Sequence, residues 1–108
     1  MNFMAKEDEM KIVCNVRASE FVTRTYTINV GSGNQFVSWL ASTACLQFGQ
    51  EHYPNGIYIP TLLRKENDDI PHPRNRIKDT DLKDGDVVYI TLKDKTREPD
   101  EDEKLWYR

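Results

Sequence analysis

The apolar residues of this chain follow two different periods, and the change between them constrains the fold more than any other feature. Residues 10–17, 25–30 and 87–92 alternate apolar and polar side chains, which is typical of half-buried strands. Between the second and third segments the apolar residues recur at every fourth position, at Phe36, Leu40, Ala44 and Phe48. This spacing predicts one helix over residues 35–48 with a single apolar side. A helix that covers one face of a sheet predicts an α+β domain.

The breaks between these segments predict where each element begins and ends. The first two strands follow one another closely and are expected to form an antiparallel hairpin. Residues 31–34 break the second strand, and Ser32 or Asn34 is expected to cap the N-terminus of the helix. Gly49 follows the last apolar position of the helix and is expected to lie just past its end.

A long polar stretch separates the helix from the last strand. Residues 57–65 resume an extended pattern, but Pro60 cannot donate a hydrogen bond within a sheet, which favours an edge strand or a bulge. Ile70 is a lone apolar residue before a Pro-rich loop at residues 71–73, and a very short strand is expected to end there. The sheet is therefore expected to have four to five strands. The polar segment between the Pro-rich loop and the last strand contains two apolar residues that are expected to pack into the core, Ile77 and Leu82.

Length and charge exclude several classes of function. A chain of 108 residues has the usual size of one domain, and it has no run of about 20 apolar residues that would cross a membrane. Its net charge of -3 gives no overall basic field to hold nucleic acid. The first residues are acidic where a secretory signal would be apolar. We therefore expect a cytoplasmic or nuclear protein without membrane or nucleic-acid partners.

No group of residues predicts catalysis or metal binding. Cys14 and Cys45 lie among apolar neighbours without a CxxC spacing, so both are expected to be buried, reduced thiols. His52 and His72 lie in separate loops, and neither has a second ligand at metal-binding spacing. The acidic stretch at residues 79–86 fails the calcium-loop pattern, because its Gly is out of register and the bidentate Glu is missing. We expect no enzyme, no metal and no cofactor.

The order of these elements resembles the ubiquitin-like β-grasp family over residues 10–92. The resemblance depends most on residues 76–92, where an apolar anchor is followed by Leu82, an acidic turn at Gly85 and the closing strand. It implies a mixed sheet with one main helix packed across one face. Conjugated members of this family end in Gly-Gly just past the final strand, whereas residues 93–108 contain no glycine. We therefore expect a non-catalytic protein-protein interaction module or assembly subunit, monomeric on its own, and not a conjugable modifier.

The expected organisation is a flexible leader over residues 1–9, the ubiquitin-like domain over 10–92 and a charged tail over 93–108. Candidate partner-binding residues on the sheet lie opposite the predicted core positions; they are Val13, Tyr58, Tyr89 and Thr91. The tail ends in three large apolar side chains, which either fold back onto the sheet or dock on a partner; they are Leu105, Trp106 and Tyr107. Trp39 lies off the centre of the apolar side of the predicted helix. It either contacts the sheet at the edge of that side or is exposed and anchors a partner.

A second resemblance, to doublecortin-type domains, depends on basic residues on either side of the Pro-rich loop. Doublecortin-type domains share the β-grasp plan and bind the acidic surface of microtubules. The basic residues of this chain are Arg64, Lys65, Arg74, Arg76 and Lys78. This alternative implies a microtubule- or cilium-associated domain with cytoskeletal partners, in which Arg74 and Arg76 contact the acidic surface.

Overall fold

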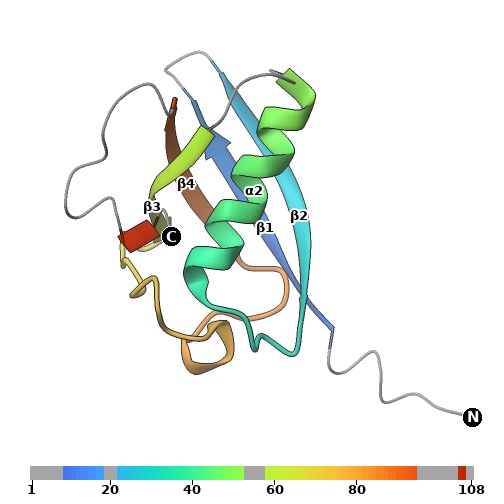
Figure 1. Cartoon of the computed structure of the whole chain (residues 1–108). Helices are drawn as coiled ribbons and strands as arrows, with labels where there is room; N and C mark the ends of the chain where they lie inside the picture. The colour runs from blue at the N-terminus through green and yellow to red at the C-terminus, as the bar shows by residue number, and fades with distance from the viewer. Residues whose placement is uncertain (1–8, 19–21, 53–57, 95–104, 107–108) are drawn as a thin grey trace, which may run out of the picture.

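The computed structural model describes residues 9–18, 22–52, 58–94 and 105–106. Within these residues the elements follow the order β1 (Met10–Arg17), β2 (Thr23–Gly31), α2 (Val37–His52), β3 (Tyr58–Lys65), η1 (Ile77–Asp79) and β4 (Val87–Asp94). Figure 1 shows α2 lying across one face of the sheet, while η1 is a single 3-10 turn before the last strand. This is a β-grasp-like α+β architecture, as the sequence predicts.

The sheet is mixed, with the strand order β2-β1-β4-β3. β1 pairs antiparallel with β2, which confirms the hairpin, and parallel with β4, which pairs antiparallel with β3. β3 is therefore an edge strand, as Pro60 predicts. The described residues contain no fifth strand at Ile70, which is 54% exposed in irregular chain. That prediction was wrong, because one apolar residue between a turn and a proline has no alternating pattern to bury.

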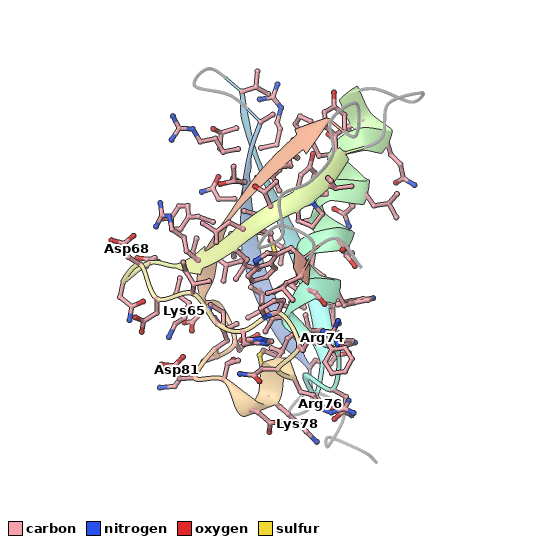
Figure 2. The ribbon with its side chains drawn as sticks, turned by 60° about the vertical axis from the view of Figure 1, so that its left-hand side comes forward. Lys65, Asp68, Arg74, Arg76, Lys78 and Asp81 are labelled. Carbon is pink, nitrogen blue, oxygen red and sulfur yellow. The ribbon has the colours of Figure 1, made fainter. Side chains whose placement is uncertain are left out.

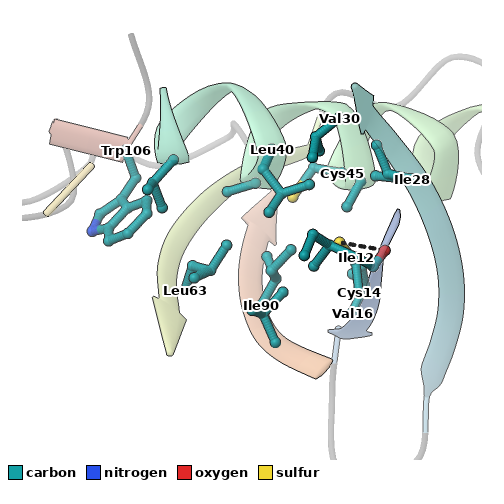
Figure 3. Packing of buried hydrophobic residues seen from close by; sticks show 14 of the residues in the cluster. Ile12, Cys14, Val16, Ile28, Val30, Leu40, Cys45, Leu63, Ile90 and Trp106 are labelled. Carbon is teal, nitrogen blue, oxygen red and sulfur yellow. Dashed lines mark hydrogen bonds between the residues drawn. The ribbon is translucent and has the colours of Figure 1, made fainter. Parts of the chain in front are cut away.

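One apolar core fills the space between α2 and the sheet (Figure 3). Its largest fully buried side chains come from all four strands, α2 and η1; they include Phe48, Ile12, Leu40, Leu63, Ile77, Ile90, Val16 and Val30. The two predicted anchors, Ile77 and Leu82, are both buried. Gly85 has a φ of 88°, a left-handed conformation that suits glycine, and its N–H donates to the carbonyl of Lys11 at 2.7 Å. The acidic turn at Gly85 therefore leads into β4 and closes the core, as predicted.

A bulge in β3 changes which of its residues face the core. The register against β4 shifts between Pro60 and Leu62, so Pro60 and Leu63 both lie opposite core residues of β4. Tyr58, two residues before Pro60, consequently lies on the side of α2. Its ring meets that of Phe48 edge to face, with the centroids 5.3 Å apart. The prediction that Tyr58 lies on the outer face was wrong, because a bulge reverses the alternation along a strand.

The N-terminal end of α2 is capped by the loop that follows β3. The N–H of Val37 donates to the carbonyl of Asn75, and the N–H of Ser38 donates to the carbonyl of Pro73, each at 2.9 Å. These bonds satisfy two of the N–H groups that a helix leaves without an internal partner. The side-chain cap predicted within residues 32–34 was wrong, because backbone carbonyls from a distant segment take that place.

At its other end, α2 continues past the predicted stop. Gly49 is buried and helical rather than lying beyond the helix end. A glycine inside a helix costs only about 1 kcal/mol relative to alanine, so packing of the surrounding apolar residues is enough to continue the helix. Among the described residues, neither α2 nor any other helix is long and apolar enough to span a membrane.

The chain beyond β4 contributes one side chain to the core. Trp106 is 3% exposed and belongs to the same apolar cluster as residues of α2 and the sheet (Figure 3). For Trp106 the structure shows the tail folding back, and docking of this residue on a partner was a wrong expectation, because the domain itself buries the indole. Leu105 is 39% exposed, and Tyr107 lies outside the described residues. The core thus includes a residue of the segment predicted as a charged tail.

Candidate functional site

The face of the sheet turned away from α2, hereafter the open face, gathers the residues that alternate with the core positions. β1 and β4 are its central strands. Their parallel register places three pairs of neighbours on this face: Val13 with Val87, Asn15 with Tyr89, and Arg17 with Thr91. Three of the four sheet residues predicted as partner contacts, all except Tyr58, therefore lie together.

Tyr89 is the centre of the open face. Arg64 reaches it from β3, where the two residues are opposite in register, and its guanidinium carbon lies 4.5 Å from the centroid of the Tyr89 ring. This is a cation–π distance. The same guanidinium forms an ion pair with Asp68, with 3.0 Å between Nη1 and Oδ1. A hollow of about 330 Å³ lies beside the pair and is also lined by Arg17 and Thr91.

The open face is basic although the chain as a whole is acidic. Among the strand residues whose side chains the structure describes, the charged ones on this face are Lys11, Arg17 and Arg64, and none is acidic. Acidic residues approach from two turns: Asp68 pairs with Arg64, and the Oδ1 of Asp84 accepts a hydrogen bond from the backbone N–H of Lys11 at 2.7 Å. Because the net charge of the chain is -3, the positive charge of this face is a local property that would attract an acidic surface.

Sequence reasoning missed several residues of this face. Asn15 and Arg17 alternate with buried residues of β1, and the pattern that identified Val13 also places them here. Arg64 could not be placed in the same way, because the bulge in β3 sets the side on which it lies. Alternation therefore identifies the regular strands of the site and fails on the irregular one.

The basic residues around the Pro-rich loop do not form one patch (Figure 2). Arg64 lies on the open face. Lys65 forms an ion pair with Asp81, and the hydrogen bond from Lys65 is the main cause that lowers the pKa of Asp81. The other three lie beside the N-terminal end of α2, and none of them forms an ion pair with a described residue; they are Arg74, Arg76 and Lys78.

The two cysteines lie inside the core, as predicted. Cys14 and Cys45 are free thiols and are at most 1% exposed. Burial raises the pKa of each thiol to about 12, and for Cys45 the neighbouring Cys14 adds to the effect. A thiolate is the nucleophilic form of cysteine, so these residues are unreactive at neutral pH.

Comparison with known proteins identifies a shared fold and no family. No protein-family model matches the chain, and no curated protein matches it. The structure is similar to a chain of the MycP5-free ESX-5 inner membrane complex, with a TM-score of 0.51 and 16% sequence identity. The match covers 85% of this chain but 23% of that chain, so this chain spans less than a quarter of the length of the protein it resembles. At this identity, the similarity is one of fold.

Proposed function

We propose that this chain is a non-catalytic protein-binding domain, an interaction module or a subunit of an assembly, that contacts its partner through the open face. The observation that carries the proposal is the stacked pair of Arg64 and Tyr89 beside Arg17, on a face without acidic strand residues. Arginine and tyrosine are enriched at protein interfaces and at the positions that contribute most binding energy. Such a face suits a partner with an acidic surface.

The fold supports an assembly role. A domain of similar architecture forms part of a chain in the ESX-5 inner membrane complex, which is a multi-protein assembly. An assembly role requires a rigid surface, and the two central strands, β1 and β4, supply one. We expect the isolated chain to be a monomer that binds other proteins.

The chemistry of the core supports a role without catalysis. Cys14 and Cys45 are the strongest nucleophiles by residue type, yet their raised pKa keeps both protonated and their burial keeps substrate away. Two buried free thiols also fit a reducing compartment, and we propose a cytoplasmic or nuclear location on that ground.

A doublecortin-like, microtubule-binding role has less support. It needs a continuous basic surface around the Pro-rich loop, whereas Arg64 lies on the open face and Lys65 is paired with Asp81. Pro73 is buried and its carbonyl caps α2, so part of this loop serves the fold rather than a partner.

The proposal is tested by placing a carboxylate on the open face. Thr91 is exposed and lies beside Arg17, so Thr91→Glu places a negative charge against Arg17 without removing a core side chain. Gln50→Glu adds the same charge at an exposed position of α2 and is the matched control. We expect proteins that co-purify with the wild-type chain from its source cells to be lost with Thr91→Glu and kept with Gln50→Glu. Equal recovery with both variants would contradict the proposal.

A further inference from the structure

The surface formed by α2 is uncharged over nearly its whole length. Residues 25–50 contain no Asp, Glu, Lys or Arg, whereas 31% of the chain is charged. A helix that packs on a sheet usually carries charged residues on its solvent side. In α2 the first charged residue along the chain is Glu51, in the last turn. The solvent side of α2 therefore lacks the usual pattern of an exposed helix.

Large apolar side chains are exposed on this surface. Phe36, the residue before α2, is 45% exposed, and Trp39 in the first turn is 38% exposed. The N–H of Trp39 donates to the carbonyl of Phe36 at 3.0 Å, which holds the two residues within one turn. Leu46 is 61% exposed and follows Trp39 by two helical turns, about 10 Å along the same side. Trp39 is thus the exposed residue that one of the two sequence alternatives predicted.

Basic side chains lie beside Phe36, at the N-terminal end of this row of exposed apolar residues. Arg76 pairs with Phe36 in an isolated antiparallel bridge, and its guanidinium carbon lies 5.3 Å from the centroid of the Phe36 ring. Its Nη1 donates to the carbonyl of Asn34. Figure 2 shows Arg74 and Lys78 near Arg76 at this end of α2. All three are exposed, and Asp79 is the neighbouring acidic residue, so the net charge here is positive.

Backbone geometry makes these side chains the groups that would bind an anion. The N–H groups of Val37 and Ser38 at the helix end already donate to the loop carbonyls of Asn75 and Pro73. A carboxylate at this end of α2 would therefore be held by guanidinium groups, which donate two parallel hydrogen bonds to a carboxylate. The two capping bonds also hold the basic segment beside Phe36.

We propose that Phe36, Trp39 and Arg76 form a second docking site, the helix-end site, for an acidic peptide segment of a partner protein. The segment places a large apolar side chain against the two aromatic rings and carboxylates against Arg76 and Arg74. Charge complementarity selects this occupant, because the exposed cations border an apolar surface that has no charge of its own. The site is separate from the open face and does not depend on the function proposed for that face.

A peptide fits this surface better than a nucleic acid. The three cations beside α2 are accompanied by Asp79, and the chain as a whole carries a charge of -3. A polyanion is held by an extended positive field, which this chain does not present. A short segment with a few carboxylates and an apolar anchor matches both the size and the mixed character of the site.

In the experiment, peptides that bind the immobilised chain are selected from a displayed random library. The dissociation constants of the enriched peptides are then measured by fluorescence anisotropy. We expect the enriched sequences to combine Asp or Glu with Trp, Phe or Leu. Arg76→Glu should weaken their binding about tenfold or more, as expected for loss of a charged hydrogen bond. Trp39→Ser, which leaves the loop contacts intact, should weaken binding severalfold. Thr91→Glu on the open face should leave the affinity unchanged.

Four results would overturn the helix-end site. The first is a selection that enriches no peptide, or only peptides without acidic residues. The second is an affinity that neither Arg76→Glu nor Trp39→Ser changes while both variants remain folded by circular dichroism. The third is tight binding of a labelled oligothymidine that the same two variants abolish, because it would assign the surface to single-stranded nucleic acid. Loss of peptide binding with Thr91→Glu alone would assign the peptides to the open face and also count against this site.

Discussion

The backbone N–H of Ser38 donates a hydrogen bond to the carbonyl oxygen of Pro73, with 2.9 Å between the two atoms. This bond joins the first turn of α2 to the loop after β3. Because Pro73 is buried, the loop is part of the packed domain and holds Arg74 and Arg76 beside the helix. The contact therefore has two consequences, one for the stability of α2 and one for the surface that surrounds its end.

The 3-10 turn η1 passes so close to Gly33 that a side chain there would collide with it. Gly33 has a φ of 81°, and a Cβ at this position would lie 2.9 Å from the backbone nitrogen of Lys78. Gly31 also has a positive φ, of 60°, but no heavy atom lies within 4 Å of its Cβ position. We expect Gly31→Ala to lower the free energy of unfolding by about 1 kcal/mol, from backbone strain alone. Gly33→Ala should lower it by about 1 kcal/mol more.

Urea denaturation of the two glycine variants and the wild type measures this difference. The comparison is matched, because both variants add one methyl group at a left-handed glycine, two residues apart in the sequence. Equal losses of stability would show that the contact between Gly33 and Lys78 does not constrain the fold.

Burial of Trp106 predicts that the end of the chain stabilises the domain. Trp106→Ala removes a large side chain that is 3% exposed, and we expect a loss of about 3 to 5 kcal/mol in the free energy of unfolding. The neighbouring Leu105 is 39% exposed, so Leu105→Ala should cost less than about 1 kcal/mol. Thermal denaturation of both variants measures this difference in stability. A wild-type melting temperature for Trp106→Ala would refute the packing of the tail onto the core.

The buried thiols should be protected until the protein unfolds. Burial raises the pKa of Cys14 and Cys45 from 9.0 to about 12, so the folded state holds their protons more tightly than the unfolded state. Their contribution to stability is therefore complete below pH 9 and is lost as the pH rises towards 12. At pH 8 a thiol reagent such as 5,5′-dithiobis(2-nitrobenzoic acid) should react slowly with the native protein and fast in denaturant. Rapid reaction of the native protein would contradict the burial of these residues.

The regular parts of the fold follow directly from sequence periodicity. Alternation in β1 and β4 places Cys14 and Ile90 inside and Val13 and Tyr89 outside, and the structure confirms all four. Every other residue of a strand faces the same side, so a strand without irregularities needs no further information. The three candidate residues on these two strands were predictable for this reason.

The irregular parts depend on contacts between distant segments. The bulge after Pro60 places Tyr58 against the core and Arg64 on the open face, and no local pattern reveals a shift of register. The start of α2 is set by carbonyls of the Pro-rich loop rather than by a nearby side chain. Trp106 packs into a core formed by residues far earlier in the chain. In each case tertiary packing decides between alternatives that the sequence leaves open.

The central claim is that the open face binds an acidic surface of a partner protein. The most direct test is the dissociation constant of the purified full-length chain with a partner recovered from its source, measured by isothermal titration calorimetry. We predict that Thr91→Glu weakens binding about tenfold or more, as expected for a repulsive charge within an interface, while its melting temperature stays close to that of the wild type. Gln50→Glu should bind as the wild type does. An equal dissociation constant for all three proteins would contradict the claim.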